Sequence, residues 1–90
     1  MRDLPEIRME IDQINEDLLA LLNRRASLAL EVKTAKIASG MHLDDYYCPE
    51  REQHILEDLI KKNKGPLQDS DIKIIFQAVM TCSLALQRRA

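Results

Sequence analysis

The stretch from Glu6 to Ala38 constrains the fold of this 90-residue chain more than any other part of it. It contains neither Pro nor Gly, and apolar side chains recur every three or four residues, as on one face of an α-helix. The stripe consists of Ile7, Ile11, Ile14, Leu18, Leu21, Arg25, Leu28, Val32 and Ala35. A helix of this length spans roughly 50 Å, which is too long to bury its stripe inside one small globule. We therefore expect it to lie against another long element, most simply a second copy of itself.

One position in the stripe is charged, and this limits what can pack there. Arg25 stands where Leu or Ile would be expected, whereas the adjacent Arg24 falls outside the stripe. Burying a guanidinium without a partner costs several kcal/mol, because its hydration is lost without compensation. The sequence therefore predicts that an anionic group meets Arg25.

Two shorter helices are expected after the long one. Pro49 opens the second helix, Gly and Pro follow its end, and a polar cap precedes the third helix. The expected helices cover about 5–38, 49–63 and 68–88, with a loop at 39–48. The apolar residues are mainly Leu, Ile, Ala, Met and Val, which suit helices better than strands. We therefore expect one all-α domain of three helices.

Charge and composition exclude several classes of protein. The net charge is −2 and the basic residues are dispersed, which argues against nucleic-acid binding. No apolar run is long enough to span a membrane, and none follows Met1 as in a signal peptide, so we expect a cytoplasmic protein. Cys48 and Cys82 form no disulfide or zinc pattern, and His42 and His54 lack partners for a metal site or a catalytic dyad. An enzyme with this sequence would need no metal, cofactor or covalent intermediate.

Three basic side chains could meet at one ligand if two chains pair. Arg25 and Lys36 are eleven residues apart, which places them on one helix face, roughly 16 Å apart along the axis. Arg8 is about 25 Å from Arg25 and cannot share their ligand within the same helix. An antiparallel copy that crosses near the middle would bring its own Arg8 close to both. Such a site suits a small dicarboxylate, because arginine pairs bidentately with carboxylate.

Four further polar residues are available to complete this site. Arg51 and Glu52 fall in the first turn of the second helix, and Ser83 and Gln87 fall on the core-facing row of the third. Polar side chains on such a row weaken packing unless they bind something. For Ser83 and Gln87, the alternative is a polar, frayed end of the third helix.

Five segments resemble the all-helical chorismate mutases, in register and over nearly the whole chain. They are Ile7-Arg8-x-x-Ile11-Asp12, Leu18-Leu19-Ala20-Leu21-Leu22-x-x-Arg25, Glu31-Val32-x-x-Ala35-Lys36, Pro49-Glu50-Arg51-Glu52 and Phe76-x-x-Val79-Met80-x-x-Ser83-x-x-x-Gln87. The likeness is greatest to the N-terminal mutase domain of bifunctional chorismate mutase–prephenate dehydratases, through residues 46–52 and 63–67. We expect residues 1–90 to be a stand-alone form of this domain or one excised from a longer protein.

The resemblance implies an intertwined homodimer that converts chorismate to prephenate without a cofactor, in phenylalanine and tyrosine biosynthesis. It assigns Arg25 and the partner subunit's Arg8 to the substrate carboxylates, and Lys36 and Gln87 to the ether oxygen of the breaking bond. Glu52 would hold the ring hydroxyl. The rest of the wall would consist of Arg51, Ser83, Val32, Met80 and Leu84.

The sequence departs from the family pattern at Cys48, which belongs to the expected substrate-binding set but stands where many relatives have Asp. Two alternatives to a mutase also remain open. An isochorismate pyruvate-lyase would use the same scaffold and carboxylate clamp, although a smaller or apolar residue would then be expected in place of Glu52. A non-catalytic helical dimerisation or regulatory module would not need charged and polar residues on buried faces.

Overall fold

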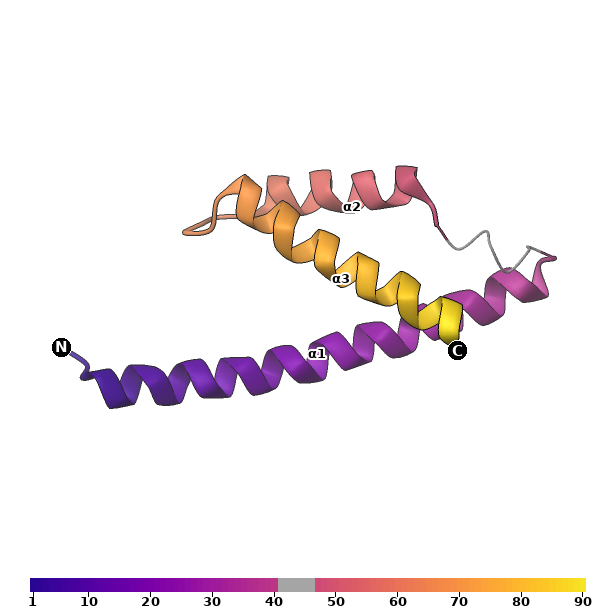
Figure 1. The fold of residues 1–90 in the computed structure, drawn as a ribbon. Coiled ribbons are helices and arrows are strands. Elements are labelled where there is room, and N and C mark those ends of the chain that lie inside the picture. Colours follow the sequence, from indigo (N-terminus) through magenta and orange to yellow (C-terminus); the bar gives the residue numbers. More distant parts are fainter. Residues whose placement is uncertain (41–46) are drawn as a thin grey trace.

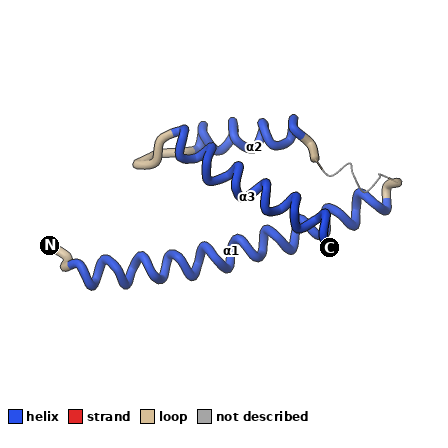
Figure 2. Tube along the Cα trace, viewed as in Figure 1, coloured by secondary structure: helices blue, strands red, loops and turns tan. Residues whose placement is uncertain are grey.

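The computed structural model describes residues 1–40 and 47–90, and these ranges form three helices and no strand (Figures 1 and 2). The helices are α1 (Leu4–Ala38), α2 (Pro49–Lys62) and α3 (Asp69–Arg89), each within one residue of the expected bounds. The prediction of an all-α fold with one very long helix is therefore confirmed. Most of the expected 39–48 loop, together with His42, lies outside the described residues.

Local signals in the sequence account for both ends of α1. At the N-terminus, Oδ1 of Asp3 accepts a hydrogen bond from the backbone N–H of Glu6 at 3.0 Å, and Pro5 occupies the first turn. This cap satisfies one of the amides that a helix start leaves without a partner. At the C-terminus, the N–H of Ser39 bonds to the carbonyl of Ala35, and Gly40 follows at a φ of 88°. Gly adopts this left-handed conformation without the steric cost that a Cβ would add.

The helices α2 and α3 form a hairpin with a small core between them. The α3 helix begins with a capping box in which the Gln68 N–H donates to Oδ2 of Asp71 at 2.9 Å. Leu56 on α2 and Ile72 and Met80 on α3 are each less than a tenth exposed and form the apolar core. None of the described helices is long and apolar enough to cross a membrane.

The three helices are arranged so that α3 lies between the other two. The α3 helix packs against both α2 and α1, and it meets α1 along the C-terminal half of that helix (Figure 1). The N-terminal half of α1 diverges from the hairpin, and its first turns reach beyond the connection between α2 and α3 (Figures 1 and 2). The helix crossing therefore lies in the C-terminal half of α1, which contains Arg25 and Lys36.

The long helix leaves its apolar stripe uncovered in the single chain. No residue of α1 is buried, and the large apolar residues of the stripe remain between 40% and 59% exposed. The radius of gyration is 16.4 Å, whereas a compact domain of this length has about 12 Å. The accessible surface is 7381 Å², against about 5,400 Å² for a compact monomer of this mass. The accessible surface of the single chain thus exceeds that of a compact monomer by an amount comparable to a stable subunit interface, and the exposed stripe of α1 is part of it.

We predict that Leu56→Ala destabilises the fold by about 2–5 kcal/mol, because it removes a buried side chain at the contact between α2 and α3. Urea unfolding followed by circular dichroism at one fixed protein concentration measures this loss. The matched control is Leu67→Ala, since Leu67 lies between the two helices and is 47% exposed. Equal losses for the two variants would contradict a core centred on Leu56.

Candidate active site

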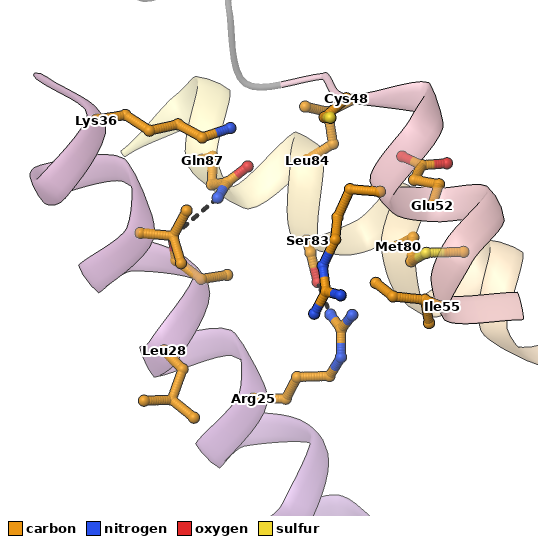
Figure 3. A pocket seen from close by; sticks show the side chains of 13 residues that line it. Arg25, Leu28, Lys36, Cys48, Glu52, Ile55, Met80, Ser83, Leu84 and Gln87 are labelled. Atoms are coloured by element: carbon orange, nitrogen blue, oxygen red, sulfur yellow. Dashed lines mark hydrogen bonds between the residues drawn. The ribbon is translucent and has the colours of Figure 1, made fainter. Parts of the chain in front are cut away.

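A cavity of about 310 Å³ lies where the three helices come together (Figure 3). Its walls come from the C-terminal half of α1, the first turns of α2 and the C-terminal half of α3. The residues that line it are Arg25, Leu28, Ala29, Val32, Lys36, Cys48, Arg51, Glu52, Ile55, Met80, Ser83, Leu84 and Gln87. The cavity is therefore built from side chains far apart in the sequence and exists only in the folded chain.

The cavity contains every residue that the sequence assigned to the site except Arg8. Arg8 is exposed near the opposite end of α1, about 25 Å along the helix axis from Arg25. Nothing in the described part of this chain could bring it to the cavity, because α1 is one continuous helix between the two positions. Within one chain, the site thus lacks its third expected cation.

The Arg25 side chain is held in a fixed position by α3. Nη1 of Arg25 donates to Oγ of Ser83 at 2.7 Å, and that hydroxyl donates onward to the carbonyl of Val79 at 3.0 Å (Figure 3). No carboxylate of the described residues lies within ion-pair distance of Arg25. The sequence predicted an anion at this position, and the protein itself supplies a neutral hydroxyl. The guanidinium charge is therefore oriented but not neutralised.

The charges around the cavity favour an anionic ligand. Of the described lining residues, Arg25, Lys36 and Arg51 are positively charged and Glu52 alone is negatively charged. Apolar residues from all three helices form the rest of the wall, so charges inside it are screened less than they would be in open water. Within the described ranges, no group of His, Cys, Asp or Glu residues is arranged to hold a metal ion. The cavity can therefore bind and orient a small dianion through its side chains alone.

Gln87 is buried in the cavity wall, and its amide is oriented by α1. Gln87 is only 7% exposed, and its Nε2 donates to the carbonyl of Ala29 at 2.8 Å (Figure 3). Because a carbonyl can only accept, this contact fixes which end of the amide faces α1. The α3 helix continues to Arg89, so Gln87 does not belong to a frayed end. The second N–H of the amide remains to serve a ligand.

Comparison with known proteins assigns this arrangement to a family. The family model for chorismate mutase type II matches residues 7–88. The chain belongs to the chorismate mutase type II family. A chorismate mutase of Methanocaldococcus jannaschii is 38% identical over 96% of this chain and 85% of its own length. The crystal structure of the Helicobacter pylori chorismate mutase in complex with prephenate matches at a TM-score of 0.84 and 29% identity, covering 96% of this chain and 90% of that one.

Some longer relatives are named as bifunctional proteins with a second activity. The bifunctional chorismate mutase/prephenate dehydratase of Stutzerimonas stutzeri is 36% identical over 94% of this chain. The chain spans about a quarter of the length of that relative, because the match covers 24% of it. The similarity to mutase domains of bifunctional proteins that the sequence suggested is thus confirmed.

The position that departs from the chorismate mutase pattern, Cys48, lies at the N-terminus of α2. Cys48 is the N-cap residue of α2, and its exposed thiol makes no capping hydrogen bond. Its Sγ instead lies 3.7 Å from Oε2 of Glu50, in the first turn of the same helix. Cys48 lines the cavity, but its thiol adds no negative charge there as an Asp would. Among the described residues, Glu52 is therefore the only carboxylate that lines the cavity.

Three residues that line the cavity were not among the site residues predicted from the sequence. Leu28 and Ala29 follow Arg25 by about one helical turn, and Ile55 follows Glu52 by three residues. Each sits on the same helix face as a predicted site residue, so helical spacing could have indicated them. Their apolar side chains were instead assigned to helix packing, because periodicity alone does not separate a cavity wall from a core.

We predict that Gln87→Met changes the free energy of unfolding by less than about 1 kcal/mol. Met has a similar volume, and the Ala29 carbonyl keeps its helical hydrogen bond within α1, so no buried polar group is left unpaired. Urea unfolding at fixed protein concentration checks the value, with Gln77→Met on the exposed face of α3 as the control. A loss of several kcal/mol in the free energy of unfolding would mean that Gln87 contributes to the stability of the fold.

Proposed function

We propose that this chain is a chorismate mutase, which converts chorismate to prephenate by a Claisen rearrangement without a covalent intermediate. The observation that carries the proposal is the cavity in which Arg25, Lys36, Arg51 and the buried Gln87 amide meet beside an apolar wall. Chorismate is a dicarboxylate that contains an ether oxygen and a ring hydroxyl, so it matches these groups in charge and hydrogen bonding. Family membership and the prephenate complex of the H. pylori relative support the same reaction.

The reaction breaks one carbon–oxygen bond and forms one carbon–carbon bond within a single molecule, so it needs no acid, base or nucleophile. An enzyme can accelerate it by holding the substrate in the compact reactive conformer and by stabilising charge that develops on the ether oxygen. Arg25, oriented by Ser83, binds one carboxylate and limits the rotation of the side chain that carries it. The apolar residues Val32, Met80 and Leu84 exclude water and favour the compact shape.

Lys36 and Gln87 are the residues that we assign to the ether oxygen. As the bond breaks, negative charge develops on this oxygen, and donors that are already in position stabilise it without reorganisation. The Ala29 carbonyl holds one end of the Gln87 amide, which leaves the second N–H for the substrate. Lys36 lies in the last turn of α1 and supplies the positive charge.

The remaining polar residues bind parts of chorismate that do not react. Glu52 is half-buried and is the one carboxylate among the described lining residues, so we assign it to the ring hydroxyl. Arg51 adds positive charge next to the carboxylates. Cys48 contributes the edge of the wall at the start of α2.

The proposal includes an intertwined homodimer, because the exposed stripe of α1 is complementary to itself. Antiparallel pairing about Leu18 places Ile14 opposite Leu22 and Ile7 opposite Ala29, so apolar residues meet on both sides of Leu18. The uncovered area of the single chain has the size that obligate dimers bury.

This pairing would also complete the active site. Arg8 of the partner subunit would lie level with Leu28, one helical turn from Arg25, and would supply the cation that the single chain lacks. A second hollow of about 390 Å³ adjoins the cavity and shares Arg25 and Arg51 with it. The apolar residues Leu59 and Phe76 of this hollow would receive side chains of the partner helix.

Product analysis tests the activity directly. Incubated with chorismate, the protein should form prephenate, and incubated with isochorismate it should release no pyruvate. Chromatography with mass detection follows both products, and Arg25→Ala protein serves as the control for uncatalysed rearrangement. Pyruvate and salicylate from isochorismate would instead indicate a lyase, and no turnover of either substrate would indicate a non-catalytic module.

We predict that Lys36→Ala lowers kcat/KM for chorismate about a hundredfold to a thousandfold, roughly 3–4 kcal/mol. The reason is the loss of a positioned donor to the ether oxygen. A chorismate absorbance assay measures the rate, and Lys61→Ala, an exposed residue in the last turn of α2, is the matched control. A Lys36→Ala enzyme within tenfold of the unmodified protein would exclude the proposed role.

The two-chain site predicts recovery of activity in mixed dimers. Arg8→Ala and Arg25→Ala proteins should each be nearly inactive, since each lacks one guanidinium in both sites. When equal amounts are unfolded together and refolded, about half of the dimers combine the two chains and have one intact site each. Activity should recover to about a quarter of the unmodified value. If mass spectrometry detects mixed dimers but activity does not return, Arg8 and Arg25 do not act across chains.

A further inference from the structure

We propose that Asp3 is a positioning residue for catalysis. By capping α1, it holds Arg8 of its own chain in the orientation that the partner subunit's cavity requires. This inference rests on the proposed function and on the two-chain site. It concerns a residue that lines no cavity and lies at the far end of α1 from Lys36.

Short-range interactions hold the start of α1. Oδ1 of Asp3 accepts from the Glu6 N–H at 3.0 Å, and the Asp3 carbonyl accepts from the Ile7 N–H at 3.2 Å. The Arg2 guanidinium forms an ion pair with Glu10 and also donates to the Glu6 carbonyl at 3.4 Å. All of these contacts lie within the first ten residues, and Asp3 makes two of them.

The hairpin of α2 and α3 gives this end of α1 no support. Leu4 is 55% exposed and Met9 is 72% exposed, and the N-terminal half of α1 extends past the other helices (Figure 1). Helix ends without tertiary contacts fray, and they do so more when the cap is lost. In the proposed dimer, the stripe residues of α1 pack on the partner. The first turn, however, is still held at its start by one side-chain cap, the hydrogen bond from the Glu6 N–H to Asp3.

Arg8 depends on this first turn through its backbone. It is the fifth residue of α1, so its N–H bonds to the carbonyl of Leu4 in the helical pattern. When the first turn unwinds, this bond is lost. The backbone of Arg8 is then no longer fixed, so its guanidinium has no defined position. A catalytic group has to stay within roughly 0.5 Å of its working position, so such fraying reduces the fraction of competent sites.

A directional test uses mixed dimers of Arg25→Ala and Arg8→Ala chains, purified through two different affinity tags. In these dimers the single intact site takes Arg8 from the Arg25→Ala chain. Asp3→Ala is then introduced either into that chain or into the Arg8→Ala chain, whose first turn serves only the inactive site. The two preparations contain the same three substitutions and differ only in which chain carries Asp3→Ala.

We expect KM for chorismate to rise about fivefold when Asp3→Ala is in the Arg25→Ala chain, and to stay unchanged when it is in the other chain. The change should fall mainly on KM, because Arg8 binds a carboxylate that is charged before and during the reaction. Asp3→Asn in the Arg25→Ala chain should restore the original KM, since Asn is an equally good cap.

Asp71→Ala is the matched control, because it removes one half of the capping box of α3. Any effect on KM should be larger when it is in the Arg8→Ala chain, whose α3 lines the intact site, which is the opposite of the pattern expected for Asp3→Ala. Equal effects of Asp3→Ala in both chains, or none in the Arg25→Ala chain, would overturn the positioning role. Failure of the parent mixed dimer to show activity would instead reject the two-chain site, so the two failures are distinguishable.

Discussion

The hydrogen bond from Arg25 to Ser83 joins the middle of α1 to the C-terminal half of α3, and the site depends on it. It places a guanidinium in a seam whose other members are apolar. A Leu at this position would pack against a neighbouring helix at no desolvation cost, whereas a buried arginine needs hydrogen bonds and a counter-charge. The described residues supply the hydrogen bond and leave the charge without a counter-ion. This is a poor arrangement for stability and a good one for binding an anion, and family membership agrees with the second interpretation.

The proposed dimer gives a physical reason for the length of α1, because one helix would then serve two sites. Its C-terminal half carries Arg25 and Lys36 and crosses α3 beside the cavity. Its N-terminal half reaches past the hairpin, and in the proposed dimer it delivers Arg8 to the other cavity. A shorter helix would lose either the seam around Leu18 or the reach to the partner's site. In the proposed dimer, the same apolar stripe would hold the two chains together and set the distance between Arg8 and Arg25.

The helices could be predicted from the sequence because their limits are set locally. Asp3, Pro49 and Gly40 act within one turn of their own helix end, and the apolar period of α1 extends over its whole length. The contacts of Arg25 with Ser83, and of Gln87 with the Ala29 carbonyl, could not be predicted in the same way. Each joins residues 58 positions apart, and it depends on how α1 and α3 cross. Helical spacing places a residue on a face, but it does not give the partner on the facing helix.

Position 87 lies at the crossing of α1 and α3, and this burial limits which hydrogen-bond donors can stand there. A charged donor at a position only 7% exposed would lose most of its hydration, and nearby Lys36, Arg25 and Arg51 would repel it. A neutral amide avoids both costs, because the Ala29 carbonyl satisfies one N–H inside the helix contact. In the proposed reaction, the other N–H would meet the ligand from a fixed direction. The charge needed at the reacting oxygen can come from Lys36, which is only half-buried and so keeps part of its contact with water. In the proposed reaction the site would thus divide its two tasks, with orientation supplied by a buried neutral group and charge supplied by a partly exposed one.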